Sequence, residues 1–271
     1  MISVVIIGAG NVATHLYKAF DRAETVTVNQ WFNRNIDSLR SYKNSVDITD
    51  DLSQLKAADV YIIAISDDAV AKLSTQLPFE NRLVVHTSGT VNIHDLDKKN
   101  RRGVFYPLQT FSKNAALDFA SVPICIETIE KSDLKTLKTL ASAIGSKSHK
   151  VNTNQRKSLH LAAVFVNNFP NQLYRVAHEI TEEEGGEFEI LKTLILETAK
   201  KVQELSPYMA QTGPAKRNDK KTIKKHLEGL KNQQHIAIYE LLTASIQKTH
   251  GVPTVSKSNA PRNKTHGRKK L

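Results

Sequence analysis

The chain has a single cysteine, Cys125, and lacks long hydrophobic runs. One cysteine excludes an intramolecular disulfide and any zinc site built from several cysteines. No window approaches the roughly 18 consecutive apolar residues of a membrane-spanning helix. The first ten residues, MISVVIIGAG, also lack the basic stretch and cleavage site of a secretory signal. We therefore expect a cytoplasmic protein with no membrane association.

Acidic residues are outnumbered, with 27 Asp and Glu against 38 Lys and Arg, for a net charge of +11. Six of the basic side chains lie in residues 252–271, a segment without acids that we expect to be disordered. A second basic cluster, within 216–225, falls on the outer face of a predicted helix whose apolar residues are Ile223, Leu227 and Leu230. No aromatic residues interleave with the basic ones, so a solvated surface is favoured over nucleic-acid binding.

The first half of the chain alternates short β-branched segments with helical ones. Several of the segments are apolar at consecutive positions, which indicates burial on both faces, as in a parallel sheet covered by helices. The predicted strands are 2–7, 25–32, 60–65, 83–87, 103–106 and 123–127. Helices or crossovers are predicted at 11–23, 35–42, 68–77 and 132–144. This alternation is typical of a doubly wound α/β domain.

After residue 152 the pattern changes to helices alone. Amphipathic helices are predicted at about 153–184, 187–206, 219–231 and 233–249. Strands first and helices later indicate two domains. We therefore expect a Rossmann domain with a mostly parallel sheet at 1–152, a smaller all-α domain at 153–251 and the basic tail at 252–271.

A glycine-rich turn follows the first predicted strand and opens a helix. It has the form G-x-G-x-x-A, a dinucleotide-binding motif, and spans Gly8, Gly10, Asn11, Val12 and Ala13. In this motif the first glycine allows the tight turn, the second admits a pyrophosphate, and the small third residue permits close helix–strand packing. Backbone N–H groups at the helix start then face the phosphates. A glycine turn that merely reverses the chain is the alternative.

The end of the second predicted strand indicates which dinucleotide binds. An NAD site usually places Asp or Glu there, whereas residues 25–35 contain no acid. Asn33 and Arg34 occupy the turn instead, and the Arg34 guanidinium suits a 2′-phosphate. The sequence thus favours NADP (NADPH), although Arg34 is also explained as an ordinary surface residue. Polar residues at the ends of two later strands, Ser66 together with Ser88 and Gly89, suit contact with the nicotinamide ribose.

Several longer segments carry a family resemblance. They are HTSGT at 86–90, YPLQTF at 106–111, LHLAAVFVNNFPNQLY at 159–174 and TGPAKRNDKKTIKKHL at 212–227. With GAGNVA they resemble a bacterial family of Rossmann-like proteins with a C-terminal helical domain of unknown function, related to NADP-dependent pyrroline-carboxylate reductases and β-hydroxyacid dehydrogenases. The resemblance implies this fold and an NADP site, but no substrate. One departure is Asn218, where the family would have glycine; asparagine tolerates left-handed backbone conformations.

The helix that begins near residue 153 carries a polar stripe. His160, Asn167 and Asn171 lie on one face, with Asn168 beside them. In the related dehydrogenases the corresponding helix presents polar groups to the substrate. His160 is therefore a candidate general acid–base, with Asn167 or Asn168 orienting the substrate oxygen. An interhelical hydrogen-bond network would satisfy these polar groups equally well.

Other candidates are secondary. Gln109 and Thr110 could line the substrate cleft, and Arg217 could bind a substrate carboxylate. Pro170 is expected to kink its helix, and Asp68 to cap the helix it precedes. Cys125 is expected to be a buried structural thiol. The ten histidines show no metal-ligand spacing, so no metal site is predicted.

These patterns favour an NADP-dependent oxidoreductase that acts on a small molecule, with hydride transfer in the cleft between the two domains. Family analogy adds the expectation of a homodimer through the helical domain. A non-catalytic NADP-binding sensor or scaffold needs the same glycine turn and remains the alternative. The polar stripe separates the two hypotheses. Catalysis predicts that it faces a cleft within about 4 Å of the position of the nicotinamide C4, and a binding module predicts that other side chains seal it.

Overall fold

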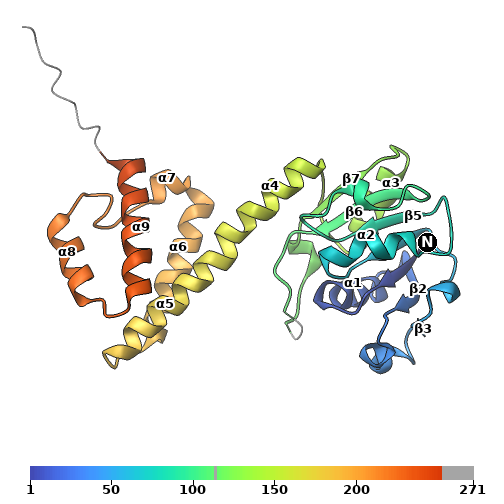
Figure 1. Ribbon diagram of the computed structural model, residues 1–271, viewed down its shortest axis with the longest axis horizontal. Coiled ribbons are helices and arrows are strands. Elements are labelled where there is room, and N and C mark those ends of the chain that lie inside the picture. Colours follow the sequence, from blue (N-terminus) through green and yellow to red (C-terminus); the bar gives the residue numbers. More distant parts are fainter. Residues whose placement is uncertain (113–114, 252–271) are drawn as a thin grey trace, which may run out of the picture. The chain divides into compact units, whose positions relative to one another are not determined.

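The computed structural model describes residues 1–112 and 115–251. A sheet of eight strands organises the N-terminal half, in the spatial order β3-β2-β1-β4-β5-β6-β7-β8 (Figure 1). All neighbouring strands are parallel except the antiparallel pair β6 and β7, which confirms the mostly parallel sheet. The strands are β1 (Ile2–Ile7), β2 (Val26–Phe32), β3 (Ile48–Thr49), β4 (Val60–Ile63), β5 (Leu83–His86), β6 (Arg101–Pro107), β7 (Ile124–Thr128) and β8 (Ser148–Lys150).

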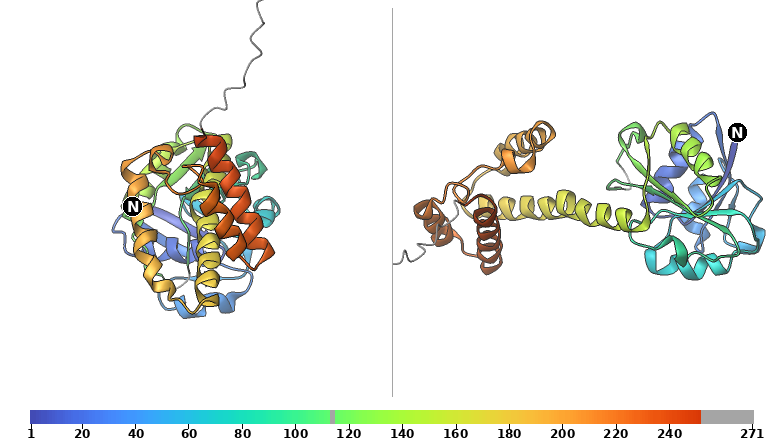
Figure 2. Two further views of the ribbon diagram at one scale, coloured as in Figure 1. Left: turned by 90° about the vertical axis from the view of Figure 1, so that its left-hand side faces the viewer. Right: turned by 90° about the horizontal axis from the view of Figure 1, so that it is seen from above.

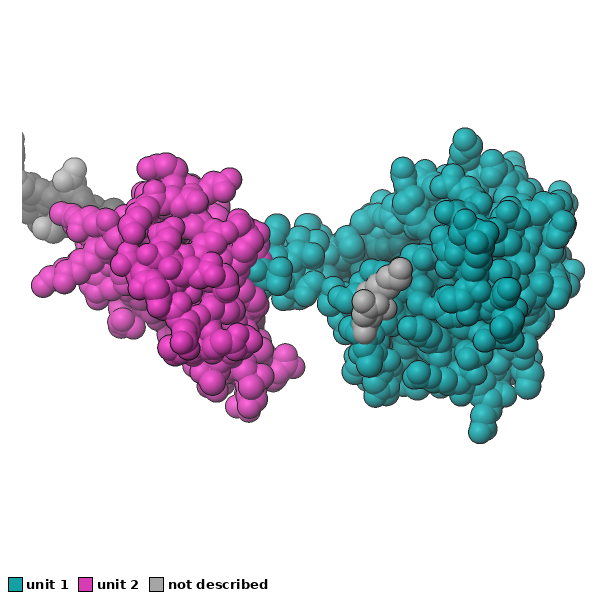
Figure 3. Space-filling model, turned by 90° about the horizontal axis from the view of Figure 1, so that it is seen from below, with its two compact units in different colours: residues 1–171 teal, residues 172–271 magenta. Residues whose placement is uncertain are grey.

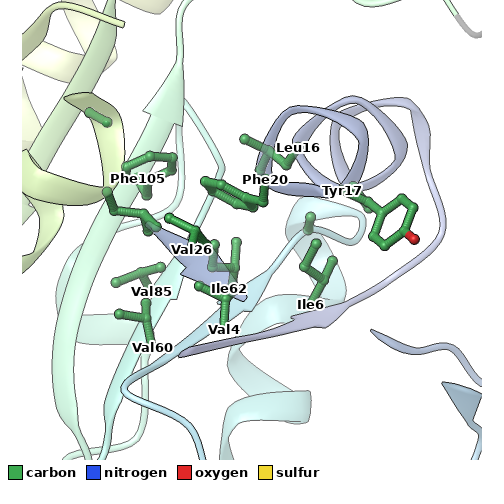
Figure 4. Packing of buried hydrophobic residues seen from close by; sticks show 14 of the residues in the cluster. Val4, Ile6, Leu16, Tyr17, Phe20, Val26, Val60, Ile62, Val85 and Phe105 are labelled. Carbon is green, nitrogen blue, oxygen red and sulfur yellow. The ribbon is translucent and has the colours of Figure 1, made fainter. Parts of the chain in front are cut away.

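Helices cover both faces of the sheet. Alternate residues of β1 point to opposite faces, so Val4 and Ile6 belong to the core cluster that includes α1 (Asn11–Asp21) and α3 (Asp133–Ala143). Val5 and Ile7 belong to the cluster that includes α2 (Asp67–Thr75). Figure 2 shows α2 and α3 on opposite sides of the strands, and Figure 4 shows the first of the two clusters. The domain is doubly wound, as the sequence predicts.

Short 3₁₀ helices fill several connections. The segment expected as a helix or crossover at 35–42 is the 3₁₀ helix η1 (Ile36–Tyr42), begun by Asn35, whose side chain accepts from the N–H of Asp37. The others in the sheet half are η2 (Leu52–Gln54), η3 (Ile93–Asp95) and η4 (Phe119–Ser121). The expectation that Asp68 caps α2 is wrong. Ser66 occupies the N-cap position, and Asp68 lies within the first turn.

The second half is helical, as predicted. Its elements are α4 (Thr153–Ala163), η5 (Val164–Asn168), α5 (Phe169–Glu183), η6 (Phe188–Leu191), α6 (Lys192–Glu204), α7 (Pro207–Ala210), α8 (Lys220–Gly229) and α9 (Gln233–His250). A π-helical turn, η5, lies just before Pro170, which has no N–H to donate. The kink expected at Pro170 stays a prediction. None of the helices in the described part of the chain has the length and apolar character to span a lipid bilayer.

The chain divides into two compact units, Met1–Asn171 and Gln172–Leu271 (Figure 3). We call them the sheet unit and the helical unit. Secondary structure changes at residue 152, where the sequence boundary was placed, but α4 and η5 belong with the sheet unit. The Arg156 side chain of α4 fixes this attachment by donating to the backbone O of Ser88, at 3.0 Å. The expected tail, 252–271, lies outside the described residues.

Polar pairs join the helices of the helical unit. His235 of α9 is buried and bonds Glu179 of α5, with 3.0 Å between Nε2 and Oε2. Lys231 donates to Glu184 at 2.8 Å. Asn218, in the loop before α8, has φ +54°, so asparagine here adopts the left-handed conformation that the family resemblance assigns to glycine.

Candidate cofactor and substrate site

The glycine turn after β1 packs closely against neighbouring backbone at Gly8 and leaves open space at Gly10. Gly8 has φ +117°, and a Cβ there would lie 2.2 Å from the backbone O of Ala64, so no other residue fits. Its carbonyl accepts from Trp31 Nε1 at 2.6 Å. Gly10 is the N-cap of α1, and a Cβ built on it meets no atom within 4 Å. The space above Gly10 is therefore open, and the first N–H groups of α1 face it.

A pocket of about 660 Å³ lies over this turn. Seven of the ten predicted cofactor-binding residues line it: Gly8, Gly10, Asn11, Val12, Asn33, Arg34 and Ser66. Its charged lining residues, among those described, are Arg34 and Lys72, with no acid. Asp37, the first acid after β2 in the sequence, lies in η1 and pairs with Arg40 at 2.8 Å. The pocket thus combines free helix N–H groups with two cations, an environment for an anionic ligand.

Three predicted cofactor residues do not line this pocket. Ala13, in the first turn of α1, is fully buried, in the packing role that the motif implies. Ser88 turns its hydroxyl inward and accepts from the N–H groups of Thr90 and Val91, each at 3.0 Å. Gly89 faces His160 instead. From this turn it is Thr87, not singled out by sequence, that reaches the pocket.

A second pocket, of about 460 Å³, lies between the end of β6 and the helix α4–η5. It brings together five of the predicted catalytic and substrate-binding residues: His160, Asn167, Asn168, Gln109 and Thr110. His160, Asn167 and Asn168 of the polar stripe therefore line a pocket and are not sealed by other side chains of the sheet unit. Asn171 is exposed and does not line this pocket. Arg217 is exposed in the helical unit, and its proposed role in binding a carboxylate stays a prediction.

Tyr106 is the principal residue of this pocket that sequence reasoning missed. Its hydroxyl lies 3.0 Å from Nδ1 of His160, with the two rings edge-on. Burial raises the pKa of Tyr106 to about 12, so the hydroxyl keeps its proton. A tyrosine at the carboxyl end of a predicted parallel strand, inside the YPLQTF segment, was the available signal.

A buried polar cluster supports the turn behind the pocket. Arg156 is fully buried, and its Nη2 lies 3.2 Å from Glu127 Oε2. His86, also fully buried, accepts from the N–H of Ser88 at Nδ1. Burial, and then the Arg156 charge, lower the pKa of His86 to about 3. His86 is thus a neutral structural histidine, unsuited to acid–base work at neutral pH.

Metal and thiol chemistry find no support in the residues described. No group of three or more His, Cys, Asp or Glu in 1–112 and 115–251 is arranged to hold a metal ion. Cys125 is buried, and burial raises the pKa of its thiol, which makes it a poor nucleophile. This agrees with the structural role expected from the sequence.

Comparisons with known proteins agree with this architecture. Residues 122–246 match a domain of unknown function (DUF2520). A candidate NADP oxidoreductase from Bacteroides fragilis is 38% identical with a TM-score of 0.82, over 91% of this chain and 98% of that one. A protein from Thermotoga maritima is 21% identical with a TM-score of 0.71, over 91% and 98%. A pyrroline-5-carboxylate reductase from Coxiella burnetii is 16% identical with a TM-score of 0.56, over 93% and 99%.

These matches fix the class of protein and then its family. The fold is a Rossmann fold followed by a helical region, shared with structures of 16–21% identity. More narrowly, the chain belongs to the family of Rossmann-fold proteins that carry the DUF2520 domain, together with the Bacteroides fragilis protein. No curated protein matches the chain.

Proposed function

We propose that this protein is an NADP-dependent oxidoreductase acting on a small molecule. The observation that carries the proposal is the pocket over the glycine turn, where helix N–H groups meet two cationic side chains and no acid among the described residues. The 38% identical Bacteroides fragilis relative is described as a candidate NADP oxidoreductase, which supports the proposal. The family's pyrroline-carboxylate reductase neighbours support the reaction class, through the shared fold alone.

The residues of the pocket fit a dinucleotide. The open space at Gly10 and the start of α1 would hold the diphosphate by backbone N–H donation. Arg34 would pair with the 2′-phosphate, since no carboxylate from the β2 turn lines the pocket to repel it. Asn33 holds that turn by donating to the backbone O of Asn35 at 2.8 Å. When bound, NADPH supplies the hydride.

The second pocket would hold the substrate. His160 would act there as general acid–base on a carbonyl or hydroxyl, because its ring lines the pocket and is only partly buried. The amides of Asn167 and Asn168, on the π-helical turn, would orient the substrate oxygen. The sensor hypothesis predicts a sealed stripe, so the pocket beside His160, Asn167 and Asn168 supports the oxidoreductase proposal. The distance of this pocket from the nicotinamide C4 stays a prediction.

A fluorescence titration with NADPH and with NADH tests the cofactor. We expect tighter binding of NADPH, and Arg34→Ala to weaken it by about 1–3 kcal/mol, or roughly 5- to 150-fold, because a charge-assisted contact is lost. Arg40→Ala is the matched control, since Arg40 pairs with Asp37 and does not line the pocket. Equal affinity of the wild type for both cofactors would contradict the assignment of Arg34.

We also propose that the protein forms a homodimer through the helical unit. The support is the apolar surface that its described helices leave uncovered. Leu194 of α6 is 62% exposed, and Leu241 of α9 is 72% exposed. Exposed apolar surface of this kind marks an association site.

A further inference from the structure

Two side chains of α1 hold the chain segment that follows β6. Asn11 Nδ2 donates to the backbone O of Phe111 at 2.8 Å, and Nε2 of His15 lies 3.0 Å from the backbone O of Ser112. A carbonyl oxygen only accepts, so the His15 ring carries a proton on Nε2 and donates it. Asn11 and His15 are spaced i, i+4 and therefore donate to two successive carbonyls from one face of α1. We call this pair of residues the α1 clip.

The α1 clip fixes residues 109–112 to the sheet unit. Among the described residues, the other hydrogen bonds of this segment stay within 107–115. The Phe111 ring packs beside His15, with 5.4 Å between the ring centroids. His15 is only 5% exposed, whereas Gln109 and Thr110 are exposed. The position of these two exposed residues therefore depends on α1.

The α1 clip also joins the two pockets of the candidate site. Asn11 lines the pocket over the glycine turn. Gln109 and Thr110 line the second pocket together with His160. His15 lines neither of these pockets, so a substitution there reaches them only through the segment that it holds.

We propose that Asn11 and His15 are positioning residues that set Gln109 and Thr110 in the wall of the substrate pocket and couple this wall to cofactor binding. The proposal rests on the function proposed above. A dinucleotide at the start of α1 orders the Asn11 side chain, which costs conformational entropy. The bond to Phe111 orders that side chain beforehand, so the held segment and the cofactor favour each other. Such coupling is reciprocal, and loss of the α1 clip therefore weakens cofactor binding.

NMR of the intact protein with ¹⁵N-labelled histidine tests the α1 clip without any ligand. Imidazole nitrogen shifts distinguish the two neutral forms of the ring, and His15→Gln assigns the signal by removing it. At about pH 8, where an ordinary histidine is neutral, we expect the Nε2–H form for His15. The Nδ1–H form would overturn the proposal, because Nε2 could not then donate to Ser112.

A matched pair of variants tests the positioning role. In His15→Gln the amide N–H lies close to the former position of Nε2 and still reaches the Ser112 carbonyl. In His15→Asn the side chain is one methylene shorter and does not reach it. With ¹⁵N-labelled threonine, the Thr110 amide signal, assigned by Thr110→Ser, should move in His15→Asn and stay near the wild-type position in His15→Gln. Coinciding Thr110 signals in all three proteins would refute the positioning role.

NADPH titration of the same proteins tests the coupling. We expect His15→Asn to weaken NADPH binding about three- to tenfold, the effect of losing one neutral hydrogen bond. His15→Gln should bind NADPH within about twofold of the wild type. Equal affinity of the two variants, or tighter binding by His15→Asn, would refute the coupling.

These measurements separate the levels of inference. Absence of NADPH binding by the wild type would refute the proposed function and the coupling, while the Thr110 signals would still decide the positioning role. Normal NADPH binding that is equal in the two variants would refute the coupling alone. The nitrogen shifts of wild-type His15 test the α1 clip even if His15→Asn does not fold.

Discussion

The sheet unit and the helical unit differ in where their apolar side chains lie. In the sheet unit, residues such as Ile6, Phe20 and Trp31 are fully buried between strands and helices. In the described part of the helical unit, the buried hydrophobic residues are Val176 and Ala215, while larger ones stay exposed. The sheet unit therefore contains its own hydrophobic core, whereas the described helices of the helical unit bury few apolar side chains.

This difference follows from the two sequence patterns. Consecutive apolar residues in parallel strands are buried by helices supplied from the same unit. Amphipathic helices instead need a facing surface for their apolar stripes, and α6 and α9 leave theirs partly uncovered. Polar bonds such as His235–Glu179 and Lys231–Glu184 join the helices without replacing that burial. The homodimer proposed above would supply a facing surface for these stripes.

The largest expected effect is on the core of the sheet unit. Phe20→Ala should cost about 3–5 kcal/mol, because a fully buried aromatic ring is replaced by a cavity. Trp31, the one tryptophan of the chain and fully buried in this unit, reports the transition by fluorescence during urea unfolding. Leu196→Ala, at a side chain 55% exposed in the helical unit, should change the Trp31 transition by less than about 0.5 kcal/mol. Similar losses of stability in the two variants would contradict the difference in burial between the two units.

The next effect concerns association. Leu241→Asp should weaken the proposed homodimer at least about tenfold, or about 1.4 kcal/mol, because a carboxylate would be buried at the interface. Sedimentation over a range of protein concentrations measures the change. Leu241→Met, which keeps an apolar side chain, should leave the dimer intact. A wild type that is monomeric at every concentration would contradict the homodimer and leave the exposed helices unexplained.

Much of the fold could be predicted because its signals are local. The run of apolar residues in β1 and the glycine turn after it are read directly from neighbouring residues. The glycine expected at position 218 came from the family resemblance, and Asn218 adopts the left-handed conformation that asparagine tolerates. Strands β3 and β8 were missed because two and three residues are too few to carry a hydrophobic pattern.

The candidate site was predictable only in part, because some of its signals are local and others depend on tertiary packing. The glycine turn and the stripe on α4–η5 are local patterns, and both line pockets. The bond between Tyr106 and His160 joins residues 54 positions apart, and the Arg156–Ser88 bond joins residues 68 apart. Such pairings depend on how strands and helices pack, which a single sequence does not specify.

The last effect concerns pH and again separates the units. The pKa of His86 is about 3 in the folded sheet unit, because of burial and then Arg156, against about 6.5 when unfolded. The unfolded chain therefore binds the proton first, and stability is lost as pH falls from about 6.5 toward 3. This one group contributes a slope of at most about 1.4 kcal/mol per pH unit.

His86→Asn isolates this contribution, because asparagine retains an acceptor for the N–H of Ser88 and does not titrate. Between pH 6.5 and 4, the Trp31 transition of the wild type should lose stability more steeply than that of the variant. Helical circular dichroism, to which the helical unit contributes strongly, should respond less to the substitution. Equal loss of stability with falling pH in the two proteins would mean that His86 takes up a proton in the folded state. The core of the sheet unit would then have to contain a cavity or water beside His86.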